Sequence, residues 1–277
     1  LVTNIAELAD TIKKAFQIAA SGRPGPVVVD VPKDVTQAMA KFSYPQEDIF
    51  IRSYQPVVQG HIGQIKKAVQ MLASAKRPIV YFGGGVVLGN ASEEMTKFVR
   101  MIGAPCTGTL MGLGAYPSSD RQFLGMLGMH GTYEANLAMQ NADVVLAIGA
   151  RFDDRVISVP SKFFEKAKKI IHIDVDPSSI AKRVKVDIPI VGDVKNVLSE
   201  MIQLWGKQES APAADSLDKW WKSIEEWRSR NCLWFDNESE IIKPQYVIQK
   251  LAEITNNSAI ITSDVGQHQM FTAQYYP

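Results

Sequence analysis

A cluster of charged residues directly follows an apolar run at residues 144–148. The run, VVLAI, is typical of a strand that is covered on both faces of a parallel sheet. It ends at Gly149, and the polar residues that follow are Arg151, Asp153, Asp154 and Arg155. The forked donors of arginine suit a diphosphate or a carboxylate. The alternative is a salt-bridged surface loop, in which each exposed pair contributes only about 0–1 kcal/mol to stability.

Other predicted strand ends also carry small or polar residues. They are Gly83, Gly84 and Gly85 after residues 79–82, Thr109 and Leu110 after 105–107, Asp174 after 169–173, and Asp193 after 189–191. Glycines let a phosphate approach the backbone or let a helix pack closely on a strand, and their spacing here is not Gly-x-Gly-x-x-Gly. An acidic side chain at a strand end can accept a hydrogen bond from a ribose hydroxyl, or it can cap the helix that follows. Because ligands bind beyond the carboxyl ends of strands in open α/β sheets, one dinucleotide could span these positions.

A glycine-rich turn at residues 125–131 surrounds His130. No serine or cysteine with a third orienting residue has the spacing of a catalytic triad, so this histidine does not indicate nucleophilic catalysis. Met111, Met126 and Met129 suit either core packing or contact with a planar ring.

Two further segments carry donors for an anion. Arg23 follows a predicted helix end and has the same two interpretations as the charged loop, a partner of an anion or a member of a surface salt bridge. Gln267, His268 and Gln269 follow a predicted strand. Amide, imidazole and guanidinium groups in such places suit a diphosphate. From residue types alone we predict a protein that binds a dinucleotide or a diphosphate, and the residue types specify no reaction.

The elements that position these residues alternate between helices and strands. Repeated β–α units of this length predict an α/β fold with a doubly wound parallel sheet. Stretches rich in proline, glycine and polar residues divide the chain further. The predicted segments are 1–34, a linker at 35–60, 61–206, a linker at 207–216, and 217–277.

The two flanking segments contain incomplete α/β units. The first has a helix that ends near Gly22 and a strand at 27–31, and the second has a helix at 217–235 and a strand at 259–262. Four tryptophans in the helix at 217–235 are expected to anchor packing against another domain. Because these pieces cannot bury their own apolar faces, and because the sequence begins at Leu1, we expect an internal part of a longer protein.

The composition excludes several classes of protein. A hydrophobic content of 46% with 21% charged residues is that of a globular protein, and a net charge of +1 gives no electrostatic reason to expect nucleic acid or an anionic membrane as partner. No apolar run approaches the roughly 20 residues of a membrane span. Cys106 and Cys232 are too few for a disulfide framework, and their spacing is not that of metal ligands. This favours a reducing compartment, and we expect a cytoplasmic protein.

Four motifs in this order resemble one family. They occupy residues 22–27 with 32–34 (GRPGPV and PKD), 126–131 (MLGMHG), 149–155 (GARFDDR) and 264–270 (DVGQHQM). The chain resembles the catalytic subunits of acetohydroxyacid synthase (acetolactate synthase), which are thiamine-diphosphate enzymes of branched-chain amino-acid biosynthesis. The resemblance implies three domains. Residues 1–34 would end a pyrimidine-binding domain, 61–206 would form a Rossmann-like central FAD-binding domain, and 217–277 would begin a diphosphate-binding domain.

The resemblance also implies roles for individual residues. The FAD-binding residues would be Arg23, Gly84, Gly85, Thr109, Leu110, Leu127, Gly128, Met129, His130, Gly149, Ala150, Arg151, Asp153, Arg155, Asp174 and Asp193. Those near thiamine diphosphate would be Gln267, His268 and Gln269. Those along the substrate channel, where relatives bind herbicides, would be Lys33, Met129, Asp154 and Arg155.

The implied reaction is the condensation of two pyruvates, or of pyruvate and 2-ketobutyrate, with loss of CO2. The resemblance places the activating glutamate and the ligands of Mg2+ outside residues 1–277, so no catalytic residue is expected within the chain and the chain alone is expected to be inactive. The implied partners are further catalytic subunits, as a homodimer or homotetramer, and a small regulatory subunit. Alternatives are a pyruvate oxidase-type enzyme in which FAD turns over, and a non-catalytic flavin- or nucleotide-binding module.

Overall fold

The centre of the protein is a six-stranded sheet with the order β3-β2-β1-β4-β5-β6, in which every neighbouring pair is parallel. Its strands in the computed structural model are β1 (Pro78–Phe82), β2 (Cys106–Gly108), β3 (Phe123–Met126), β4 (Val144–Ile148), β5 (Lys169–Asp174) and β6 (Ile188–Val191). The structure describes residues 1–157, 159, 163, 166, 168–207, 214–238 and 240–277. The parallel α/β sheet predicted from the sequence is confirmed, and its strand order reverses between β1 and β4.

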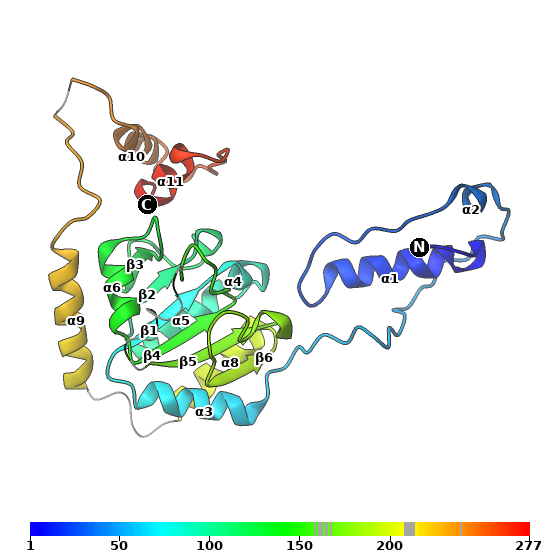
Figure 1. The fold of residues 1–277 in the computed structure, drawn as a ribbon, viewed down its shortest axis with the longest axis horizontal. Coiled ribbons are helices and arrows are strands. Elements are labelled where there is room, and N and C mark those ends of the chain that lie inside the picture. The colour runs from blue at the N-terminus through cyan, green and yellow to red at the C-terminus, as the bar shows by residue number, and fades with distance from the viewer. Residues whose placement is uncertain (158, 160–162, 164–165, 167, 208–213, 239) are drawn as a thin grey trace.

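Helices cover both faces of the sheet (Figure 1). On one face lie α3 (Ile62–Ala73), α4 (Gly84–Leu88), α5 (Ser92–Ile102) and α8 (Val194–Gly206). On the other lie α6 (Tyr133–Asn141) and α9 (Ala214–Arg228). This arrangement makes the fold doubly wound, with an apolar core on each side of the strands.

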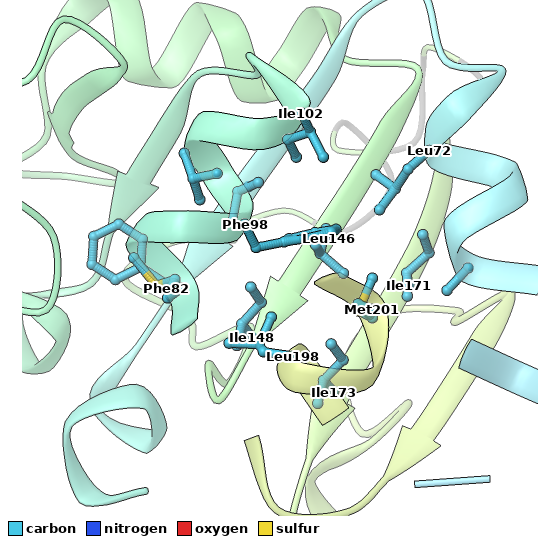
Figure 2. Close-up of a cluster of buried hydrophobic side chains, with 14 of the residues drawn as sticks. Leu72, Phe82, Phe98, Ile102, Leu146, Ile148, Ile171, Ile173, Leu198 and Met201 are labelled. Carbon is cyan, nitrogen blue, oxygen red and sulfur yellow. The ribbon is translucent and has the colours of Figure 1, made fainter. Parts of the chain in front are cut away.

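Alternate residues of the strands supply the two cores because successive side chains of a strand point to opposite faces. In β1, Val80 and Phe82 belong to the α5 side, while Ile79 and Tyr81 belong to the α6 side. All five residues of β4 are buried. Figure 2 shows the larger cluster, in which side chains of α3, α5 and α8 pack against the strands. Burial on both faces accounts for the unbroken apolar runs in the sequence.

The N-terminal segment contains η1 (Ile5–Glu7), α1 (Leu8–Ala20) and α2 (Lys33–Gln37). The predicted helix is confirmed, and Gly22 has the positive φ of 60° that a residue just after a helix end often adopts. The strand predicted at 27–31 is wrong. Val28 is 91% exposed, and the single backbone bond from Val2 N to Asp30 O does not make a ladder. Extended residues need a neighbouring strand, and the described chain supplies none here.

The C-terminal segment contains α10 (Pro244–Ile254) and α11 (Gln267–Tyr275). The strand predicted at 259–262 is also wrong, since Ile260 is 95% exposed and no strand of the described residues lies beside it. Most of the linker predicted at 207–216 lies outside the described residues. No helix in the part of the chain that the structure describes has both the length and the apolar character needed to cross a membrane.

Two tryptophans attach α9 to the sheet. Trp220 and Trp221 are buried, and their indole Nε1 atoms donate to Pro78 O at 3.0 Å and Gly103 O at 2.9 Å. The predicted packing is therefore confirmed for these two side chains, while packing against a separate domain stays a prediction, and Trp234 lies beyond the helix and is exposed. The division of the chain into domains stays a prediction, but this packing favours a boundary after α9 rather than before it.

The buried side chain of Lys168 donates hydrogen bonds to carbonyl groups in the last turn of α6. Its Nζ atom donates to Met139 O at 3.1 Å and to Gln140 O at 3.4 Å, and it lies 4.1 Å from the centre of the Phe163 ring. Burial, with a smaller contribution from nearby Lys166, lowers the pKa of Lys168 to about 8. Between this value and the ordinary lysine pKa of 10.5, the folded amine is neutral while the unfolded one stays charged.

The lowered pKa predicts a pH dependence of stability. Folding releases a proton above pH 8, so the contribution of Lys168 to the free energy of unfolding should rise as the pH increases from about 8 toward 10.5. We therefore expect the urea midpoint of the unchanged protein, measured relative to that of the Lys168→Met variant, to rise as the pH increases over this range. The other titrating groups are common to both proteins, so their effects cancel in the difference. A midpoint difference that does not change between pH 7 and pH 10 would contradict the prediction.

Candidate functional site

A cavity of about 840 Å³ opens beyond the carboxyl ends of the central strands. Its wall includes residues at the ends of β1, β3 and β5, residues that follow β2, β4 and β6, the turn after α1, and Met270 of α11. The residues predicted for FAD that line it are Arg23, Gly84, Gly85, Thr109, Leu110, Leu127, Met129, His130, Gly149, Ala150, Arg151, Asp153, Arg155, Asp174 and Asp193. The structure thus brings together residues that are up to 170 positions apart, since Arg23 and Asp193 share one wall.

Glycines line one side of this cavity, where the backbone at Gly83 and Gly85 contacts the backbone at Gly149. The amide of Gly85 donates to Gly149 O at 3.0 Å. A Cβ atom on Gly85 would lie 2.6 Å from Gly149 Cα, and one on Gly83 would lie 2.5 Å from Gly149 O. Close packing is therefore established for these glycines, and the same absence of side chains leaves their backbone open to the cavity. The packing interpretation of the glycines is confirmed, and the interpretation that a phosphate approaches their backbone stays a prediction.

Two acids line the cavity in different ways. Asp193 Oδ1 accepts from Asn196 N at 3.0 Å, so Asp193 caps α8 as well as facing the cavity. Asp174 lies at the end of β5, is 8% exposed, and accepts from Asp176 N at 2.9 Å. Burial raises the pKa of the Asp174 carboxyl. A buried acid whose charge is only partly compensated is well suited to accept a hydrogen bond from a ligand hydroxyl.

The charged loop after β4 contains an ion pair and also lines the cavity. Arg151 Nη2 lies 3.6 Å from Asp153 Oδ2, and both side chains are more than half exposed, as in the surface-loop alternative. The backbone beneath them is fixed, because the hydroxyl of Tyr81 donates to Arg151 O at 3.1 Å. Exposed pairs contribute little to stability. The guanidinium of Arg151 can therefore exchange Asp153 for an anionic ligand at small cost.

Gly128 supports the cavity without lining it. It has a φ of +100°, and a Cβ atom there would collide with the backbone of Arg155. The amide of Met129 donates to the same carbonyl, Arg155 O, at 3.1 Å. The glycine-rich turn is thus held against the charged loop, and this contact sets the positions of Met129 and His130 on the wall.

Several predicted site residues do not reach the cavity wall. Lys33 begins α2, and Asp154 turns away from the wall while its backbone amide donates to Asp153 Oδ1 at 2.7 Å. Gln267, His268 and Gln269 form the first turn of α11. That helix still reaches the site, since Gln274 Nε2 donates to His130 O at 2.9 Å and Met270 lines the cavity.

Other residues line the cavity without having been assigned a role in binding FAD, although Gly22, Pro24, Met126 and Met270 lie in the four motifs and Gly83 was named as a strand-end glycine. These other residues are Ala20, Gly22, Pro24, Tyr81, Gly83, Leu88, Gly89, Asn90, Met111, Met126, Val156, Val175, Ser179, Val194 and Met270. Met111 and Met126 had two interpretations, and both side chains contribute to the wall. Apolar or small residues outside the motifs, such as Leu88 and Val175, are identified as lining residues only by the three-dimensional arrangement.

Residues 65–201 match the family model described as "Thiamine pyrophosphate enzyme, central domain". These residues belong to the thiamine pyrophosphate enzyme family. The match contains all six strands, so the sheet corresponds to the central domain of these enzymes. The family predicted from the four sequence motifs is confirmed.

Relatives within the thiamine pyrophosphate enzyme family are similar to the chain throughout its length. The large subunit of acetolactate synthase isozyme 3 from Escherichia coli is 50% identical over 278 aligned residues, which cover 100% of this chain and 48% of the relative. The acetolactate synthase large subunit of Haemophilus influenzae has the same values. An acetolactate synthase of Mycobacterium bovis is 41% identical over 99% of this chain and 44% of its own length. The chain spans about half the length of the curated relatives it matches.

Proposed function

We propose that this chain is part of an acetolactate synthase, which condenses two pyruvates, or pyruvate and 2-ketobutyrate, with loss of CO2. The observation that carries the proposal is the 50% identity to large subunits of that enzyme over the whole chain. The family match to thiamine pyrophosphate enzymes supports the same class of cofactor. By this proposal the chain works in branched-chain amino-acid biosynthesis in the cytoplasm, in a homodimer or homotetramer of catalytic subunits with a small regulatory subunit.

The central cavity fits FAD in size and chemistry. About 840 Å³ lies in the upper part of the range for ligand pockets, as a dinucleotide requires. Arg23, Arg151 and Arg155 offer guanidinium donors for the diphosphate, and Asp174 offers a buried acceptor for a ribose hydroxyl. Gly84, Gly85 and Gly149 line the cavity without a side chain, which leaves space beside their backbone for a flat ring. FAD when bound supplies a flavin, and the resemblance assigns it no obvious redox part in the main reaction.

The first turn of α11 supports a thiamine diphosphate site next to this cavity. Gln267 and His268 are exposed there, with Gln269 behind them, and their amide and imidazole groups are donors that suit a diphosphate. Thiamine diphosphate supplies the carbanion chemistry, with Mg2+ held by residues outside the chain. The contact of Gln274 with His130 O brings α11 against the cavity wall, so both cofactors would share one neighbourhood.

The proposed substrate channel begins at the edge of the cavity, where Met129 and Arg155 lie. Met129 is 66% exposed at the cavity edge, and the guanidinium of Arg155 is the natural partner for the carboxylate of the second ketoacid. Lys33 and Asp154 lie away from the cavity wall. In this proposal they contact substrate or inhibitor only where further parts of the enzyme complete the channel.

Formation of acetolactate from pyruvate tests the proposal. The purified full-length protein with thiamine diphosphate, Mg2+ and FAD should form acetolactate and carry a yellow flavin absorbance, while residues 1–277 alone should form none. Absence of acetolactate from the full-length protein would overturn the proposed reaction. Acetolactate formation by residues 1–277 alone would overturn the prediction that the catalytic groups lie outside the chain. Net flavin reduction during turnover would indicate an oxidase instead.

A further inference from the structure

An ion pair crosses the edge of the cavity between two distant parts of the chain. Arg23 Nη1 lies 3.2 Å from Asp176 Oδ2, although the residues are 153 positions apart in the sequence. Arg23 belongs to the turn after α1, and Asp176 directly precedes η3 (Pro177–Ser179) beyond β5. In Figure 1 the turn after α1 is the end of the N-terminal segment that points toward the sheet. The pair therefore joins these two parts of the cavity wall.

Asp176 is held more firmly than an ordinary surface carboxylate. Its Oδ1 accepts from Ser178 N at 2.9 Å and from the Ser178 hydroxyl at 2.7 Å, and its Oδ2 accepts from the Ser179 hydroxyl at 3.2 Å. These bonds, chiefly that of the Ser178 hydroxyl, hold the pKa of Asp176 below its usual value. Asp176 is thus a fixed negative charge at neutral pH.

Arg23 has a fixed backbone and free donors. Gly22 has a positive φ, and the hydroxyl of Tyr54 donates to Ser21 O at 2.7 Å, which holds the turn in place. The Arg23 side chain is 54% exposed and lines the cavity. No residue in the described part of the chain accepts a hydrogen bond from its Nε or Nη2 atoms. One edge of the guanidinium is therefore occupied by Asp176, and the other donors remain for a ligand.

Exposed ion pairs contribute little to stability, so the Arg23–Asp176 pair has little value as a structural link alone. Its effect on a ligand is different, because a long side chain that is already ordered loses less entropy on binding. We propose that Asp176 is a positioning residue that holds the Arg23 guanidinium at the cavity wall, with its free donors toward the anionic diphosphate of the bound dinucleotide. This inference rests on the proposed flavin site.

A double-mutant cycle on flavin affinity tests this role. The variants are Asp176→Asn, Arg23→Ala and both together, in the full-length protein freed of flavin, with the FAD dissociation constant measured by quenching of flavin fluorescence. The asparagine keeps an acceptor for the serines and removes only the charge. We expect Asp176→Asn to weaken FAD binding by roughly 3–10-fold in the unchanged background and by less than about 2-fold when Arg23 is alanine.

Asp187 offers a matched control. Its side chain is 21% exposed, the same fraction as Asp176, and it pairs with Lys169 at 2.9 Å away from the cavity wall. Asp187→Asn should leave the FAD dissociation constant unchanged. Equal losses for Asp176→Asn in both backgrounds, which a role in capping η3 alone would produce, overturn the inference and leave the flavin site standing. Failure of the unchanged protein to bind FAD overturns the proposed flavin site and this inference with it.

Discussion

Replacing Phe82 with alanine is expected to lower the free energy of unfolding by about 3–5 kcal/mol. Phe82 is fully buried at the end of β1, and its ring centre lies 6.1 Å from that of Phe123 and 6.5 Å from that of Tyr116. The backbone also fits around it, since a Cβ atom on Gly108 would lie 2.9 Å from Phe82 Cζ. These neighbours are strand or loop residues that cannot collapse into the space, so most of the cavity would remain.

Urea denaturation followed by tryptophan fluorescence measures this loss. Trp205 packs edge-on against Phe98 in the same apolar cluster as Phe82, so its fluorescence reports on that core. Phe42→Ala is the matched control, because Phe42 is 85% exposed and its removal should change the free energy by no more than about 0.5 kcal/mol. A loss below about 1 kcal/mol for Phe82→Ala would contradict the prediction.

Gly149→Ala should damage both the fold and the candidate ligand site. Gly149 has a φ of +53°, and a Cβ atom there would lie 2.7 Å from Gly85 Cα and 3.0 Å from Val86 N. Backbone atoms cannot move aside as a flexible side chain does, so β4 and α4 must separate. We expect a loss of about 1–3 kcal/mol in stability and at least a roughly tenfold weaker affinity for FAD.

Gly206→Ala is the corresponding control, since a Cβ atom on Gly206 would meet nothing within 4 Å. The two glycine variants should be compared by urea denaturation and by FAD titration under the same conditions. If Gly149→Ala behaves as Gly206→Ala does in both measurements, the contact between the end of β4 and α4 does not have the importance that we assign to it.

The sequence predicts the parts of the fold whose burial is two-sided. The runs that become β1, β4 and β5 are apolar because helices cover both their faces, and an unbroken apolar run can be recognised in the sequence alone. It does not predict β3, because Gly125 interrupts that strand with a φ of +85° and its residues are alternately buried and half-buried. The strands predicted at 27–31 and 259–262 have suitable residues but lack a partner in the described chain, and sheet formation depends on the partner.

The candidate site was predictable where chemistry and position coincide. Arg151, Asp174 and Gly149 stand at strand ends, and parallel strands bring their carboxyl ends to one edge of the sheet. Neutral wall residues such as Asn90 and Val175 carry no comparable signal. The partnership of Arg23 with Asp176 depends on how the turn after α1 meets the end of β5, which no local pattern encodes.

The attachment of α9 defines the smallest piece of this chain that can be expected to stay soluble when it is produced separately. A piece that ends at residue 206 would lack Trp220, Trp221 and Ile224, and the rest of the apolar cluster on the α6 side of the sheet would become more exposed. The indole N–H groups that donate to Pro78 O and Gly103 O would also be missing. An apolar surface of this kind promotes aggregation, so the natural end of such a piece is Arg228, at the end of α9.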